Sequence, residues 1–369
     1  MTTVQLSFSP KSLAESGSVK LLELPSDLCQ LVESSLQSSS SPRLTIKGQP
    51  DDDAVLCTGD KTYTIRSVIL SNKILIVTPC ETDGASLNIR DQVSDILELV
   101  PCVPKLYKLD GLLKGRSFDE NQTGMDSDVP DSQGSLTYDQ AMRDIQASDD
   151  ELARALKDRR ILLINGELRP IAPGYLHQVL ELLLNVLVAL SLPYNAAPVD
   201  ELVSALAIDY EVVPPVTNHV LSWFGQVDNG KWNMDITAIV KEIGLNLLRE
   251  HKREPIEREI LMTKWKSSVG DSYESAVSLD LLSGNCITST ELGSTMLSYF
   301  PASALPAEPA ARFADLFLVR PRWKGEEISP FLTDIAINVK ERDKLLLKYC
   351  RAITDSGVVW YTARTQYNA

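Results

Sequence analysis

The sequence is poor in the residues and motifs that catalysis and metal binding use. It has three histidines in 369 residues, and each stands alone in a segment expected to be helical. The six cysteines lie far apart without a Cys-x-x-Cys pair, which argues against zinc and is typical of reduced intracellular thiols. No P-loop, dinucleotide-binding glycine motif or Gly-x-Ser-x-Gly elbow is present. These absences predict a protein that is not an enzyme and holds no cofactor or metal.

A long uncharged apolar run is also missing. The longest apolar segment, Tyr175–Leu192, is interrupted by His177, Gln178, Glu181 and Asn185. A membrane-spanning helix needs about 20 mostly apolar residues, so this segment is expected to be a buried helix of a folded domain. The first residues lack the basic-then-apolar pattern of a signal peptide. We therefore expect no membrane partner.

Positive charge is scarce. The chain has 36 Lys+Arg against 50 Asp+Glu, a net charge of −14, which excludes a general nucleic-acid coat protein. The deficit is uneven: residues 1–150 carry 13 cationic and 23 acidic side chains, residues 151–311 carry 13 and 20, and residues 312–369 carry 10 and 7. Only the C-terminal segment has a positive balance, so any contact with nucleic acid is expected there.

The N-terminal part of the chain is typical of β-structure, with short apolar or alternating segments separated by turn residues. These segments predict strands at Val4–Ser7, Val19–Leu24, Arg43–Lys47, Ala54–Thr58, Thr62–Val68 and Lys73–Thr78. A short helix is expected at Asp27–Gln37, with Ser26 as its N-cap. The spacing predicts a small β-barrel or sandwich domain over residues 1–113. Because Lys73–Thr78 is nearly continuously apolar, it indicates burial on both faces or an edge that a partner covers.

Residues 114–135 read as an acidic flexible linker, because Gly, Ser, Asp, Asn and Gln dominate them. Helical patterns follow the linker. Ser148 and Glu151 have the spacing of a capping box that opens a helix over Asp149–Arg160.

A pattern of two amphipathic helices followed by a short hairpin recurs along the last two-thirds of the chain. Three copies are predicted: Tyr138–Gln146 and Asp149–Arg160 with hairpin Ile161–Ile171; Val199–Tyr210 and Pro215–Phe224 with a hairpin turning at Asp228-Asn229-Gly230; and Ile328–Ala336 and Lys340–Ile353 with Val358–Arg364. A possible fourth copy, Ile256–Met296, has a poor hairpin. Helix pairs closed by a wing are winged-helix modules, which bind nucleic acid or protein. The expected fold is thus α+β, with winged-helix modules at 136–234 and a C-terminal winged-helix region at 235–369.

The last predicted helix carries a cationic stripe. At about 100° per residue, Lys340, Lys344, Lys348 and Arg351 fall within roughly 80° of one another. Cations on the second helix of a winged-helix pair could neutralise phosphates. The wing would add Tyr361 and Arg364, giving six candidate DNA-binding residues. The alternative is that these lysines form the polar face that every amphipathic helix needs.

Trp323 lies in a basic-aromatic segment, Arg320-Pro321-Arg322-Trp323-Lys324. It could belong to a binding element. We expect instead that it anchors this connection onto the last module.

Several stretches, in order along nearly the whole chain, resemble one known family. They are Leu21–Leu24, Ala54–Tyr63, Asp144–Ser148, Arg312–Phe317, Trp323 and Leu347–Arg364. The chain is similar to the Dcc-type sister chromatid cohesion subunit of the alternative replication factor C-like clamp loader, the loader of the chromosome-transmission-fidelity group.

The resemblance implies a non-catalytic nuclear protein of DNA replication and sister chromatid cohesion. Its β domain would co-fold with two partners, the small cohesion subunit and the C-terminal tail of the large ATPase subunit. That assembly would contact the catalytic subunit of DNA polymerase epsilon. The winged-helix end would bind single- and double-stranded DNA. The ATPase of such a loader lies in other subunits, which agrees with the missing P-loop.

A second hypothesis is open on the residues alone. The chain could be a pure protein-interaction adaptor whose winged helices dock proteins and not DNA, since its net charge repels phosphate. Steep salt dependence of binding would separate the two hypotheses.

Overall fold

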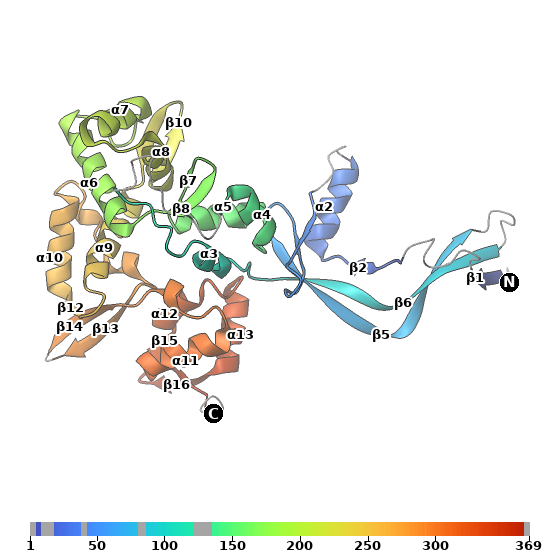
Figure 1. Cartoon of the computed structure of the whole chain (residues 1–369). Coiled ribbons are helices and arrows are strands. Elements are labelled where there is room, and N and C mark those ends of the chain that lie inside the picture. Colours follow the sequence, from blue (N-terminus) through green and yellow to red (C-terminus); the bar gives the residue numbers. More distant parts are fainter. Residues whose placement is uncertain are drawn as a thin grey trace. The chain divides into compact units, whose positions relative to one another are not determined.

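A computed structural model describes residues 5–8, 18–37, 43–79, 86–120, 135–291 and 293–364 (Figure 1). The chain divides into two compact units. The first comprises Met1–Leu106 with Met142–Leu152, and the second comprises Tyr107–Ala141 with Ala153–Ala369. Helices and several sheets are mixed along the chain, which confirms the α+β class. Most of the predicted linker, residues 121–134, lies outside the described residues.

One sheet organises the first unit. Its strands are β1 (Gln5–Phe8), β2 (Leu21–Glu23), β3 (Thr45–Lys47), β4 (Val55–Cys57), β5 (Thr62–Pro79) and β6 (Ser86–Pro101). The order is β1-β6-β5-β4-β3, and β2 also pairs with β6. Strands β1 and β2 run parallel to β6, while the other pairs are antiparallel.

The predicted barrel or sandwich is wrong for the described residues, where the strands form a single open sheet. Two segments expected as separate short strands are the two halves of β5, which is 18 residues long. No turn separates these two fully described halves: the pairing with β6 shifts register between Ile69 and Ile74, and the strand continues through the shift. Strand β6 was not predicted, because charged residues such as Arg90, Asp91 and Asp95 interrupt its apolar pattern. The long pair β5 and β6 forms a twisted two-stranded ribbon, and the described strands do not close into a barrel.

Helix α2 (Ser26–Gln37) packs its apolar side on the sheet, where Leu28, Leu56, Tyr63 and Leu99 form the core of this unit. The Asp27 carboxylate accepts hydrogen bonds from Lys61 Nζ at 2.9 Å and from the Tyr63 hydroxyl at 2.7 Å. These bonds lower the pKa of Asp27, and burial together with the Asp27 charge raises the pKa of Tyr63. The start of α2 is thereby tied to the sheet.

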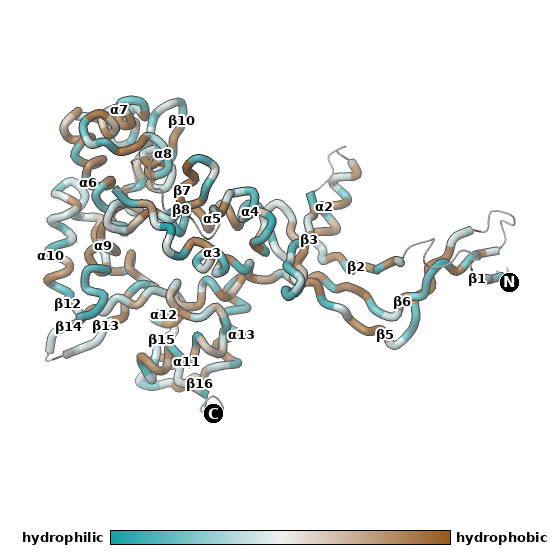
Figure 2. The backbone as a smooth tube through the Cα atoms, in the orientation of Figure 1, coloured by the Kyte–Doolittle hydropathy of each residue, from teal (hydrophilic) through white to brown (hydrophobic). Residues whose placement is uncertain are grey.

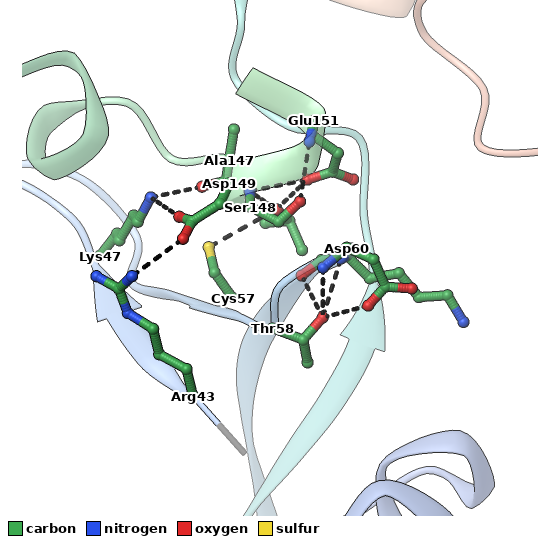
Figure 3. A network of polar contacts seen from close by, with 11 residues as sticks. Arg43, Lys47, Cys57, Thr58, Asp60, Ala147, Ser148, Asp149 and Glu151 are labelled. Carbon is green, nitrogen blue, oxygen red and sulfur yellow. Dashed lines mark hydrogen bonds and ion pairs between the residues drawn. The ribbon is translucent and has the colours of Figure 1, made fainter. Parts of the chain in front are cut away.

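A later segment, Met142–Leu152, belongs to this first unit through a polar network (Figure 3). Buried Lys47 donates to the carbonyl oxygen of Ala147 at 2.7 Å and lies 3.9 Å from Asp149, which also pairs with Arg43. The predicted capping box is confirmed. Ser148 Oγ accepts from the backbone N–H of Glu151 at 3.2 Å, and the Glu151 carboxylate accepts from the backbone N–H of Ser148 at 2.9 Å. These bonds fix the first turn of α5 (Asp149–Asp158).

The second unit repeats one arrangement of elements three times: a helix, a short strand, two or three helical segments, and a hairpin. In each repeat the short strand pairs with the second strand of the hairpin, which gives sheets β10-β11-β9, β12-β14-β13 and β15-β17-β16. Hairpin β7 (Ile161–Ile164) and β8 (Glu167–Pro170) precedes these repeats. Helices α3 (Tyr107–Leu112) and α4 (Tyr138–Asp144) come before it in the chain.

The elements of the three repeats follow in order. The first has α6 (Pro173–Ala189), β9 (Ala197–Pro198), α7 (Val199–Tyr210), α8 (Pro214–Trp223), β10 (Gly225–Asp228) and β11 (Lys231–Met234). The second has α9 (Ile236–Glu250), β12 (Ile256–Glu257), α10 (Arg258–Val269), two 3-10 turns (Glu274–Ala276 and Leu279–Leu282), β13 (Cys286–Glu291) and β14 (Ser294–Tyr299). The third has α11 (Pro309–Val319), β15 (Arg322–Lys324), α12 (Gly325–Ile328), a 3-10 turn (Ser329–Leu332), α13 (Val339–Tyr349), β16 (Cys350–Asp355) and β17 (Val358–Ala363).

The hairpin turns have the predicted conformation. Positive φ occurs at both central residues of three turns: Asn165-Gly166, Asn229-Gly230 and Ser356-Gly357. Type I′ turns require this pair of left-handed residues, and their twist matches that of the flanking strands. The weak hairpin expected within Ile256–Met296 is also present, as β13 and β14.

Three buried tryptophans hold the repeats together. Each indole N–H donates to the carbonyl oxygen of a helical residue: Trp232 to Leu221 at 2.8 Å, Trp265 to Val240 at 2.8 Å, and Trp323 to Leu316 at 3.1 Å. The predicted anchor role of Trp323 is confirmed, since it is 1% exposed. Helix α6, the longest apolar segment, is buried as expected, and no helix among the described residues is long and apolar enough to span a membrane.

Candidate nucleic-acid interface

Helix α13 carries three of the four cations of the predicted stripe, Lys340, Lys344 and Lys348, and its packing decides which way they face. Asn338 opens the helix by accepting from the backbone N–H of Glu341 at 3.0 Å. Leu346 and Tyr349 are buried on the opposite side, where the Tyr349 ring lies 5.1 Å from the ring of Phe313 on α11. Because that side is fixed against the core, the other side is held toward solvent.

All three lysines of the stripe are exposed. These residues are Lys340, Lys344 and Lys348. Lys344 Nζ pairs with Glu341 at 2.7 Å, and Lys348 Nζ lies 5.0 Å from the centre of the Tyr349 ring. Such exposed contacts exchange readily with solvent or ligand, so they leave the lysines able to meet a phosphate.

The end of the hairpin returns to the end of α13. The backbone N–H of Arg364 donates to the carbonyl oxygen of Tyr349 at 3.2 Å, and its guanidinium lies 3.4 Å from the carbonyl oxygen of Lys348. Arg364 is therefore held beside the last lysine of the stripe. The predicted helical position of Arg351 is wrong, because α13 ends at Tyr349 and Arg351 pairs as a strand residue of β16, directly opposite Thr362 of β17.

The C-terminal sheet has two unlike faces, which separate two of the predicted residues. Tyr361 pairs with Trp323 and packs against the core, so it lies on the inner face. Residues directly across from one another in a sheet share a face. The outer face therefore carries Arg351 with its partner Thr362, and Trp360 beside it on β17. Trp360, and not Tyr361, is the aromatic ring that this outer face offers.

Two cations that the sequence analysis did not select also lie on the outer face. Arg322 and Lys324 of β15 pair with Thr362 and Trp360, and their charged groups lie 4.9 and 5.5 Å from the centre of the Trp360 ring. The alternation Arg322-Trp323-Lys324 could have predicted their position. Side chains alternate between the faces of a strand, so a buried Trp323 places both cations on the outer face. Arg322 is also paired with Asp355 at 3.1 Å.

The exposed cations give this surface the positive charge that phosphate contacts would need. Its one thiol, Cys350, is buried, and burial raises the pKa of Cys350 to about 12. Groups of three His, Cys, Asp or Glu residues able to hold a metal ion do not occur among the described residues. Exposed Lys and Arg around an aromatic ring provide phosphate contacts and base stacking.

The chain resembles known proteins over most of its length. The family model described as sister chromatid cohesion protein Dcc1 matches residues 19–332. The chain is 26% identical over 377 residues to the Homo sapiens protein named sister chromatid cohesion protein DCC1, covering 97% of this chain and 92% of that one. It is 25% identical to a Dictyostelium discoideum protein named as probable DCC1, covering 87% of this chain and 88% of that protein. A Saccharomyces cerevisiae DCC1 is 25% identical over 199 residues, about half of each chain.

Proposed function

The chain belongs to the Dcc1 family of sister chromatid cohesion proteins, and from this premise we propose that it is a non-catalytic scaffold subunit of a replication factor C-like clamp loader. In this role the N-terminal sheet assembles with partner subunits, and the C-terminal repeat meets DNA during replication. The three repeats act as winged-helix modules, an assignment supported by the pairing of each short strand with its wing.

The observation that carries the proposal is the open edge of β5. Strand β4 pairs with β5 only over Thr62–Thr64, whereas β6 pairs with β5 to Pro79. On the side away from β6, residues 66–79 have no strand neighbour within the described part of the chain. A long edge of unpaired backbone groups invites an added strand.

The side chains of this ribbon support the same reading. Ile69, Ile74, Leu75 and Val77 are 85%, 39%, 40% and 38% exposed. Ile74 and Leu75 are adjacent, so they point to opposite faces. Figure 2 draws apolar stretches along β5 and β6. Apolar residues exposed on both faces and along one edge are typical of a surface that a partner covers.

The partners in this proposal are a small cohesion subunit and the C-terminal tail of the large ATPase subunit, which complete the N-terminal sheet. The resulting assembly contacts the catalytic subunit of DNA polymerase epsilon in the nucleus. The exposed cations of α13 and the outer face around Trp360 bind the phosphates of single- and double-stranded DNA. Because the chain is acidic overall, avidity from the complex supplies much of the affinity.

The second candidate function is a pure protein-interaction adaptor. The acidic composition of the chain favours it, since 50 acidic side chains repel phosphate. The two candidates differ only in whether the C-terminal repeat binds DNA.

Replacing Ile69 and Leu75 together with Ser is expected to prevent assembly with the two partner subunits. Each substitution removes one apolar side chain from the proposed interface, and the lost burial costs about 1.5–3 kcal/mol of binding free energy. The measurement is the yield of the three-chain complex after co-expression and purification through a tag on the smallest chain.

A matched control replaces Leu318 and Leu163, which are 85% and 40% exposed, as Ile69 and Leu75 are. The Leu318→Ser, Leu163→Ser variant should assemble normally. Equal yields of complex from the two double variants would refute the partner surface on β5.

A further inference from the structure

A stretch of 61 residues in the middle of the chain has no positive side chain. Between Arg169 and Lys231 there is neither Lys nor Arg. The same stretch contains six acidic residues: Glu181, Asp200, Glu201, Asp209, Glu211 and Asp228. It forms α6, α7 and α8 of the first repeat. This stretch therefore repels phosphate, and a cationic partner would complement its charge.

Helix α7 turns a mixed apolar and acidic face to solvent. Its inner side buries Leu202 and Leu206 completely. At about 100° per residue, the opposite side gathers Glu201, Ser204 and Ile208 at spacings of three and four, with Ala205 beside them. Asp209 lies at the margin of this side and is exposed in the last turn of the helix. We call these five residues the α7 face. Ile208 within it is 79% exposed.

The acidic side chains in and just after α7 have no cationic partner among the described residues. None of Asp200, Glu201, Asp209 and Glu211 forms an ion pair with another described residue. The first two lie in the first turn, where the helix dipole favours negative charge. Asp209 and Glu211 lie at the other end, where the dipole opposes negative charge. A cation docked beside Asp209 and Glu211 would reduce the repulsion between the two carboxylates. It would also offset their unfavourable interaction with the helix dipole.

We propose that the α7 face docks a basic amphipathic segment of another protein, whose apolar side covers Ile208 and whose Lys or Arg side chains meet Glu201 and Asp209. The charge of the whole repeat selects this occupant over DNA and over an acidic segment. The α7 face lies in a different repeat from α13, so its binding is independent of the proposed DNA contact and of the β5 edge.

The test uses the full chain and a fluorescein-labelled 18-residue peptide with Leu at helix positions i, i+3, i+4 and i+7 and Lys elsewhere. Anisotropy should report saturable binding, and the same peptide with Glu for Lys should not bind. The Ile208→Ser, Asp209→Asn variant should bind at least about tenfold more weakly, as expected when one buried aliphatic side chain and one ion pair are lost.

The same repeat provides a matched control. Val188 is 80% exposed at the end of α6, and Asp228 is exposed in a hairpin turn. The Val188→Ser, Asp228→Asn variant also loses one exposed β-branched aliphatic side chain and one carboxylate, and it should bind like the parent chain. No binding by the parent chain, or equal loss in both variants, would overturn the proposal. A dimer in sedimentation that only the Ile208→Ser, Asp209→Asn change disrupts would overturn it in favour of a second copy.

Discussion

Replacing Lys340, Lys344, Lys348 and Arg351 together with Glu is expected to abolish DNA binding by the full chain. Each cation that contacts a phosphate releases condensed counterions, so affinity falls as salt rises. On duplex DNA, four such contacts contribute roughly −3.6 to the slope of log affinity against log salt concentration. Reversing their sign also adds repulsion to a chain that is already at −14. Fluorescence anisotropy with labelled single- and double-stranded DNA, at low and moderate salt, measures both the affinity and its slope.

The chain offers a control with the same side chains and the same change of net charge. Lys241, Lys252, Arg253 and Lys264 are exposed in the second repeat. The Lys241→Glu, Lys252→Glu, Arg253→Glu, Lys264→Glu variant should keep salt-dependent DNA binding. Parent-like DNA binding by both quadruple variants would refute the α13 interface. No binding by the parent chain at low salt would instead favour the adaptor function.

Replacing Arg312 with Met is expected to destabilise the C-terminal repeat more than any other single polar substitution there. Arg312 is 1% exposed. Its guanidinium donates to the carbonyl oxygens of Pro306 and Phe331, each at 2.7 Å, and of Leu305 at 3.2 Å. It also forms an ion pair with Asp334, using both terminal nitrogens.

Methionine fills a similar volume but satisfies none of these acceptors, so buried carbonyl groups would lose their donors. The expected cost is about 3–5 kcal/mol of unfolding free energy, or a fall of roughly 10 °C in the melting temperature of this unit. Thermal unfolding followed by circular dichroism measures it. Asp334→Asn serves as the comparison, because Asp334 is 47% exposed and the carbonyl bonds of Arg312 survive its loss. Equal melting temperatures for the two variants would contradict a structural role of the carbonyl bonds.

Local signals predicted the hairpin turns, one helix start and the exposed lysines of one helix. Asn165-Gly166, Asn229-Gly230 and Gly357 fix left-handed turns through backbone sterics alone, so the hairpins could be located from the sequence. The capping box at Ser148 and Glu151 depends on residues three apart and was equally accessible. The lysines of α13 follow from helical periodicity, and the structure places them toward solvent.

Long-range pairing could not be predicted in the same way. The two-residue strands Ala197–Pro198 and Ile256–Glu257 are too short to leave a pattern, and only their pairing with a distant wing defines them. The length of β5 and the existence of β6 depend on each other, since each supplies the other's hydrogen bonds. The face on which Tyr361 lies was set by its contact with Trp323, nearly 40 residues earlier.

Hydrogen exchange along β5 tests most directly the claim that partner subunits complete this fold. Backbone amides of residues 66–79 that point away from β6 should exchange rapidly in the isolated chain, because no described strand covers that edge. In the complex with the two partner subunits, the account predicts strong protection over the same residues, as an added strand engages their N–H groups. Unchanged exchange over residues 66–79 in a fully assembled complex would contradict it.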